Sequence, residues 1–311
     1  MRDVFIEKIY DRMCTDENIF FLSADFGAPK LDILREQFKD RFVNVGISEQ
    51  NLINLSLGLA LEGFIVYAYA IAPFLTMRAY EQIRINLALH SQLKEINVNL
   101  IGVGAGISYD VSGPTHHCPE DITIIRNLPN IWLFSPSDWF LAESFFDYSR
   151  KIQKPKYLRF DGKPLPRIYE SLSESDLTMG FKILKEGEYL CLVSTGYMTH
   201  KALRIANLME KENIHVGVID IFLLKPFSEN LFFNLIKKYD CVITLEEAFI
   251  NKGGLDSLVS CILNDNNSNM KMRKMGVEDR YIFESGSREY LHKLNNIDED
   301  SIIRNIKEML K

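Results

Sequence analysis

Glu49 stands where a short apolar stretch meets the predicted start of a helix, a place where a carboxyl group can do chemistry. Residues 42–45 indicate a buried strand, Gly46 breaks it, and Ser48 can cap a helix that stays apolar to Leu61. In open α/β sheets, ligands bind in the crevice beyond the carboxyl ends of the strands. A carboxyl group held there beside apolar side chains can act as a general acid or base. Taken alone, the stretch favours a simpler interpretation, a glutamate that interacts with the helix dipole.

Three further motifs follow in the sequence and change that interpretation. They are Phe74-Leu75-Thr76-Met77-Arg78-Ala79-Tyr80-Glu81-Gln82-Ile83-Arg84, then Gly113-Pro114-Thr115-His116-His117 with Glu120-Asp121-Ile122, and then Leu128-Pro129-Asn130-Ile131 with Ser135-Pro136-Ser137-Asp138. Together with Gly46-Ile47-Ser48-Glu49-Gln50, they resemble motifs of the transketolase family of thiamine-diphosphate enzymes, in the same order. One such motif is a weak signal, but four in order are specific.

The resemblance implies how the chain would hold the cofactor. Glu49 matches the family glutamate that hydrogen-bonds N1′ of the aminopyrimidine ring and favours the imino form, which removes the thiazolium proton. To donate this bond Glu49 must carry a proton, and we expect burial to favour that form. Phe74 matches the aromatic ring that stacks on the pyrimidine. Ile47 and Asp25 match further cofactor contacts. Ile71 departs from the family pattern, because transketolases often carry a second phenylalanine there, and we expect it to be a wall of the cofactor pocket.

The same resemblance implies a substrate site. His116 matches a histidine that hydrogen-bonds substrate oxygens near the reacting carbon, and histidine can transfer protons near neutral pH. We therefore expect Glu49 and His116 to be the catalytic residues. His117 and Ser112 are expected to contact the substrate as well.

Three positions depart from the family pattern at the acceptor end of the site. Ser112 replaces an aspartate that reads substrate hydroxyls, Gly104 replaces a histidine, and Gly162 replaces an arginine that anchors phosphate. Arg159 is close, but two to three residues out of register. These small residues predict open space and weak binding of an ordinary pentose phosphate. We expect a modified or nucleotide-linked sugar as acceptor.

A missing motif bears on the quaternary structure. Transketolases bind the diphosphate and Mg²⁺ through a Gly-Asp-Gly segment and a later asparagine, whose oxygens suit this cation. Residues 160–163, Phe-Asp-Gly-Lys, lack the rest of that motif. The chain therefore resembles the C-terminal half of a split transketolase, with no metal ligands of its own. We expect an N-terminal partner subunit that supplies the Mg²⁺ site, within a heterotetramer that acts on small sugars.

The sequence alternates apolar strands and helices over most of its length. Residues 1–162 predict a mostly parallel sheet covered on both faces. Residues 163–178 are polar and proline-containing, as is typical of a linker, and residues 179–311 repeat the alternation. We predict an α/β protein of two domains, each a mostly parallel sheet flanked by helices. The resemblance identifies them as a pyrimidine-binding domain and a transketolase C-terminal-like domain.

The composition is that of an ordinary soluble protein, with 47% hydrophobic and 25% charged residues among 311. The net charge of −6, without a basic block, argues against nucleic acid or a membrane surface as partner. No apolar run reaches the roughly 18 residues of a membrane-spanning helix, and the start does not read as a signal peptide. Five scattered cysteines are typical of a reducing compartment. We expect a cytoplasmic protein.

Other functions compete with a ketol-transferring enzyme. The beta subunit of a 2-oxo-acid dehydrogenase shares the two-domain plan, but the Gly113-Pro114-Thr115-His116 motif favours a transketolase. Deoxyxylulose-phosphate synthase carries a similar Gly-Ile-x-Glu-Gln motif and would make this a decarboxylating transferase. A scaffold without catalysis is disfavoured because Glu49, Phe74 and His116 are all present.

Overall fold

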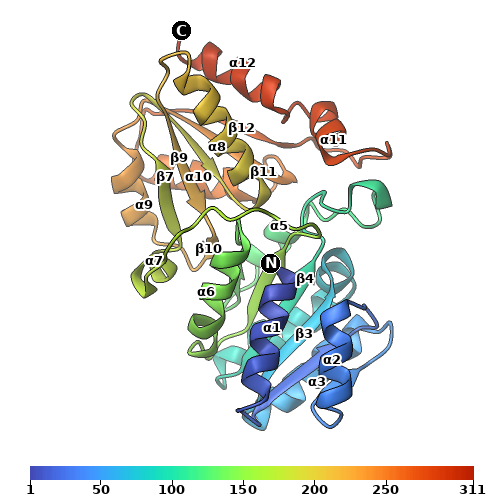
Figure 1. The fold of residues 1–311 in the computed structure, drawn as a ribbon. Coiled ribbons are helices and arrows are strands. Elements are labelled where there is room, and N and C mark those ends of the chain that lie inside the picture. Colours follow the sequence, from blue (N-terminus) through green and yellow to red (C-terminus); the bar gives the residue numbers. More distant parts are fainter.

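The first of two stacked α/β domains is built on a mostly parallel sheet (Figure 1). The computed structural model describes residues 1–311, apart from the side chain of Pro29. The sheet has seven strands in the order β10-β5-β6-β4-β3-β1-β2. Its parallel strands are β1 (Ile19–Ser23), β2 (Phe42–Asn44), β3 (Ile65–Ile71), β4 (Asn97–Val103), β5 (Trp132–Phe134) and β6 (Lys156–Phe160). Buried apolar side chains along β3 and β4 explain why helices must cover both faces.

Two helix layers cover this sheet. One layer consists of α1 (Arg2–Met13), α2 (Pro29–Gln37) and α6 (Trp139–Arg150), and the ring of Phe5 in α1 packs edge-on against Phe146 and Phe160. The other layer contains α3 (Glu49–Leu61), α5 (Asp121–Arg126) and the helical segment of residues 74–92.

Two local expectations about the start of α3 need correction. β2 lies at the edge of the sheet, where only β1 pairs with it, so its side chains are half-buried or exposed rather than buried. Ser48 does precede the first residue of α3, but its side chain makes no capping hydrogen bond.

The segment after β3 is helical, but much of it is wound as a π-helix. It consists of η1 (Phe74–Arg78, π), α4 (Tyr80–Gln82), η2 (Ile83–Leu89, π) and η3 (His90–Gln92, 3₁₀). π-turns are rare and occur frequently at functional sites. This one begins at Phe74, a predicted site residue.

The second domain repeats the plan with a five-stranded sheet in the order β12-β11-β8-β9-β7. The strands are β7 (Phe181–Lys185), β8 (Leu190–Ser194), β9 (Val216–Ile221), β11 (Cys241–Phe249) and β12 (Lys271–Val277). Only β7 runs antiparallel to its neighbour. The helices are α8 (Tyr197–Glu210), α9 (Glu229–Ile236), α10 (Leu255–Asp265), α11 (Arg288–Leu294) and α12 (Glu299–Met309). The predicted fold class, two α/β domains with mostly parallel sheets, is confirmed.

The two domains share a strand. β10 (Leu223–Lys225) belongs to the second domain by sequence but pairs antiparallel with β5 of the first sheet. The segment of residues 163–178, which we expected to be a linker, includes most of α7 (Glu174–Met179), which begins with a capping box at Ser173.

A buried aspartate lies where the domains meet. Asp220 accepts hydrogen bonds from Ser137 (2.5 Å), Tyr169 (2.6 Å) and Thr199 (2.7 Å). Burial outweighs these bonds and raises the pKa of Asp220 to about 6. Among the described residues, no helix is both long enough and apolar enough to span a membrane.

Candidate active site

The residues predicted to form the site lie at one edge of the first sheet, beyond the carboxyl ends of its parallel strands. They are Asp25 after β1, Ile47 and Glu49 after β2, Ile71 and Phe74 at the end of β3, and Ser112, His116 and His117 after β4. Because β4, β3, β1 and β2 are consecutive neighbours in the sheet, these residues share one edge. Residues 104–118, which follow β4, are called the His116 loop below.

Glu49 and Phe74 are joined by Arg78, whose role the sequence did not indicate. Glu49 begins α3, and its side chain is only 3% exposed. Arg78 donates to Glu49 Oε2 at 2.5 Å, and its guanidinium carbon lies 4.8 Å from the centre of the Phe74 ring. Phe74 and Arg78 begin and end the π-helical turn η1, which places Arg78 over Phe74. A flat cation with N–H donors thus bridges a carboxyl group and an aromatic ring.

His116 continues this group of side chains. Its ring lies edge-on to Phe74, with 5.3 Å between ring centres, and edge-on to Tyr109 at 6.5 Å. Its Nδ1 is 3.0 Å from the Thr115 hydroxyl, so that bond can orient the ring. Arg78 therefore brings Glu49 and Phe74 together, and His116 joins them by its contact with Phe74.

Asp25 lies close to the start of α3 but is exposed. Its backbone is left-handed (φ 53°), and its carboxylate accepts from Asn44 Nδ2 at 2.9 Å. Asn44 Oδ1 in turn accepts from the N–H groups of Asp25 and Gly46. Asn44 thus ties the turn after β1 to the turn that leads into Glu49, a role that no sequence motif indicated.

The other predicted residues differ in their surroundings. Ile47 is 75% exposed, Ile71 is half-buried, and Ser112 is exposed in a short 3₁₀ turn. His117 is buried, with Nε2 3.4 Å from the carbonyl oxygen of Asp110, and burial lowers its pKa. Of the two adjacent histidines, only His116 contacts Phe74.

The expected open space at the acceptor end is not there, because Tyr109 fills it. A Cβ added to Gly104 would lie 2.2 Å from Cε2 of Tyr109, and one added to Gly162 would lie 2.8 Å from its Cε1. The ring is therefore held between these two glycines, past the ends of β4 and β6. Burial raises the pKa of the Tyr109 phenol, so it stays uncharged.

Arg159 is not a free phosphate anchor. Its side chain is buried and donates through Nε to both carboxylate oxygens of Asp121, at 3.0 and 2.8 Å. Tyr157 also donates to Asp121, at 2.9 Å. The guanidinium is therefore committed to a carboxylate inside the protein.

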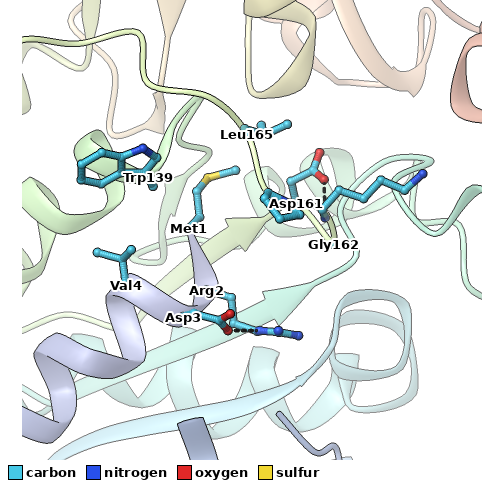
Figure 2. A pocket seen from close by; sticks show the side chains of 10 residues that line it. Met1, Arg2, Asp3, Val4, Trp139, Asp161, Gly162 and Leu165 are labelled. Atoms are coloured by element: carbon cyan, nitrogen blue, oxygen red, sulfur yellow. Dashed lines mark hydrogen bonds and ion pairs between the residues drawn. The ribbon is translucent and has the colours of Figure 1, made fainter. Parts of the chain in front are cut away.

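A separate cavity of about 240 Å³ lies at the start of α1 (Figure 2). Met1 and Arg2 line one part of it, and Asp161 and Gly162 line another. Since Gly162 also touches Tyr109, the cavity lies next to the acceptor end of the site. None of Glu49, Phe74 and His116 lines it, so it is not the place where those three meet.

The geometry suits one part of a thiamine-type cofactor. The position of the Arg78 guanidinium shows that a flat group can lie over Phe74 within hydrogen-bonding distance of Glu49. No cluster of three or more His, Cys, Asp or Glu residues that could bind a metal ion occurs in the described part of the chain. A parallel sheet with this group at its carboxyl edge, joined to a second α/β domain, agrees with the arrangement that the resemblance to thiamine-diphosphate-dependent enzymes implies.

Comparison with known proteins identifies the family. The model of the transketolase pyrimidine-binding domain matches residues 1–161, and that of the transketolase C-terminal domain matches residues 180–302. The chain therefore belongs to the transketolase family and corresponds to its C-terminal section, as the sequence motifs predicted.

Three similar proteins are described as parts of transketolases that are divided between separate chains. A putative transketolase C-terminal section of Methanocaldococcus jannaschii is 32% identical over 95% of this chain and 91% of its own. One of the subunits of an apulose-4-phosphate transketolase of Actinobacillus succinogenes is 33% identical over 86% of this chain and 84% of its own. A solved split-gene transketolase, described as an inactive β4 tetramer, is 28% identical with a TM-score of 0.86, covering 99% of this chain and 97% of its own.

Proposed function

We propose that this chain is the C-terminal subunit of a split transketolase, which transfers a two-carbon ketol unit from a ketose to a sugar acceptor. The observation that carries this proposal is the contact of Arg78 with both Glu49 and Phe74. It outlines a place for a flat, hydrogen-bonding ring in the family's pyrimidine-binding domain. Thiamine diphosphate would supply a nucleophilic carbon there, and the protein would supply orientation and proton transfer.

Each residue of the site has a distinct role in this proposal. Glu49, at the buried start of α3, donates a hydrogen bond to N1′ of the pyrimidine, after Arg78 has moved aside. Phe74 is the platform on which the ring lies, and its apolar face excludes water. His116, beside Phe74, holds the substrate oxygen next to the reacting carbon and exchanges a proton with it.

The partner subunit supplies the rest of the cofactor site. Because the sequence lacks the family's Gly-Asp-Gly segment, and because similar proteins are parts of split transketolases, an N-terminal transketolase-like chain would supply the ligands for Mg²⁺ and the diphosphate. The similar split-gene protein is described as an inactive β4 tetramer, which supports self-association of the C-terminal chain and inactivity without its partner. We propose an active heterotetramer in the cytoplasm.

The acceptor end is narrow, and the cations close to it are paired within the chain. Tyr109 closes the space between Gly104 and Gly162. The nearby cations Arg159, Lys163 and Arg288 are each paired with a carboxylate of the same chain. We infer that the acceptor is a modified sugar whose far end lacks a phosphate. Efficient turnover of ribose 5-phosphate, equal to that of unphosphorylated or otherwise modified aldoses, would contradict this part of the proposal.

The test of the proposed function is cofactor binding with and without the partner. Thiamine diphosphate and Mg²⁺ are titrated by calorimetry into this chain alone, into the proposed N-terminal partner chain, and into their mixture. We expect tight binding only in the mixture, together with ketol transfer from a ketose phosphate. Tight, Mg²⁺-dependent binding to the isolated chain would show that it contains a complete cofactor site.

A further inference from the structure

The second domain reaches into the His116 loop through a buried glutamate. Glu247 lies in β11 and its Oε2 accepts from the backbone N–H of Ile107 at 3.3 Å. Gly106, next to Ile107, has a left-handed backbone (φ 59°), and a Cβ there would lie 2.3 Å from Glu247 Oε2. The loop backbone is therefore packed directly against this carboxylate, with no room for a side chain between them.

Arg288 fixes Glu247 and ties three segments together. It donates to both oxygens of Glu247, at 2.6 and 2.5 Å, and to Asp161 at 2.7 Å. Its backbone N–H donates to Asp110 in the His116 loop at 2.8 Å. Its guanidinium also stacks 3.6 Å from the centre of the Tyr197 ring. Arg288, at the start of α11, thus joins β11 and the segment after β6 through its side chain, and the loop that carries His116 through its backbone N–H.

Lys163 lies on the solvent side of these residues. Glu247, Arg288, Asp161, Asp110 and Lys163 are called the Arg288 cluster below. Lys163 forms an ion pair with Asp110, the same carboxylate that accepts from the backbone of Arg288. Burial acts to raise the pKa of Asp110, but the Lys163 ammonium and the backbone N–H groups lower it overall. In the same way, burial acts to raise the pKa of Glu247, and the Arg288 guanidinium holds it well below its usual range. Both carboxylates are therefore charged at neutral pH, and the cluster persists there.

The ion pairs of this cluster are not expected to add much to the free energy of folding. Desolvation of buried ion pairs offsets much of their attraction, so such pairs contribute little to the free energy of folding. Their effect is instead to fix the position of the residues that they join, here the His116 loop against β11 and α11. Asp110 begins the 3₁₀ turn that leads to Gly113, its carbonyl oxygen lies 3.4 Å from His117, and His116 follows against Phe74.

We propose that Arg288, Glu247 and Lys163 are positioning residues for substrate binding, which hold the His116 loop so that His116 faces the reacting carbon. This proposal rests on the function proposed above, and it gives the second domain a part in recognition of the substrate. None of the three residues contacts Glu49 or Phe74 through a described hydrogen bond or ion pair, so activation of the cofactor does not depend on them.

The test compares two lysines in matched surroundings within the assembled enzyme. Lys163→Met removes the pair with Asp110, and Lys182→Met removes an ion pair between β7 and Asp176 of α7, whose residues are not part of the site. We expect Lys163→Met to raise KM for the ketose donor about threefold to fivefold, as for a half-exposed pair, with the melting temperature unchanged. Proton–deuteron exchange at the thiazolium carbon should stay at the wild-type rate. Lys182→Met should change none of these values.

Arg288→Lys provides a second variant that keeps the charge but loses the paired contacts with Glu247 and Asp161. We expect KM to rise about tenfold or more, because charge-assisted bonds are lost, again with wild-type thiazolium exchange. If both variants keep the wild-type KM, the proposal is overturned. If KM and thiazolium exchange worsen together, the cluster acts on the fold as a whole and the positioning role is wrong. Absence of ketol transfer in the wild-type assembly would instead count against the proposed function.

Discussion

Removal of Arg78 should strengthen cofactor binding. In the cofactor-free chain the guanidinium of Arg78 lies on Phe74 and is bonded to Glu49 Oε2, the two contacts that the pyrimidine ring needs. The cofactor can bind only after both contacts are broken. Arg78→Ala removes that competition, while alanine remains compatible with the helical backbone.

The size of the effect follows from the exposure of the pair. Arg78 is 44% exposed and Glu49 3%, so the ion pair contributes about 1 kcal/mol, the upper end for pairs that reach solvent. The cation–π contact adds about 0.5–1 kcal/mol. Since about 1.4 kcal/mol corresponds to a tenfold change in affinity, Arg78→Ala should lower Kd for thiamine diphosphate about tenfold.

The assay is a calorimetric titration of the assembled enzyme at fixed Mg²⁺. Arg84→Ala is the matched control, because Arg84 carries the same charge on the same helical segment and is also exposed, while the contacts with Glu49 and Phe74 are made by Arg78. Its Kd should remain that of the wild type. An unchanged Kd for Arg78→Ala would refute the reasoning, and a higher Kd would in addition make Arg78 a contact of the bound cofactor.

Three further predictions concern other residues. Glu49→Gln should preserve the circular dichroism spectrum but slow thiazolium proton–deuteron exchange at least about 100-fold; exchange at the wild-type rate would remove Glu49 from its role. Tyr109→Ala should open the space between Gly104 and Gly162 and raise kcat/KM for a six-carbon aldose, relative to a three-carbon aldehyde, about tenfold; an unchanged ratio would contradict the assignment of Tyr109 as the wall. Because the folded-state pKa of Asp220 is raised to about 6, its contribution is fullest in acid and is lost as pH rises through 6. Between pH 4.5 and 7.5 the wild type should therefore lose about 2 kcal/mol more stability than Asp220→Asn; equal pH dependence in urea unfolding at both pH values would disprove it.

Much of the site could be predicted because its residues lie within short motifs. Glu49, Phe74 and His116 are each flanked by family residues, and each follows a strand of the same parallel sheet. Apolar strands between helices are sufficient to place them at one edge. The location of all three could therefore be inferred without knowledge of the side-chain contacts.

The parts that could not be predicted depend on backbone detail or on distant residues. Arg78 lies inside a recognised motif, but its place over Phe74 depends on a π-turn that apolar spacing does not reveal. Tyr109 reaches Gly104 and Gly162 only because the long loop after β4 folds back on itself. Glu247 and Arg288 act on residues 106–110 across more than a hundred positions of sequence, a separation that no local pattern bridges.

Because β10 of the second domain completes the sheet of the first, the first domain depends on the second for its edge strand. A fragment that ended in the segment before α7 would lack β10 and would leave β5 as an open edge of the first sheet. Unpaired backbone groups along such an edge recruit strands from other chains, which leads to aggregation. The fragment would also lack the hydroxyl of Thr199 and the carboxylate of Asp220 at the contact between the domains. Recombination between genes of this family therefore has to carry both domains together, because one of them by itself is not a complete folding unit.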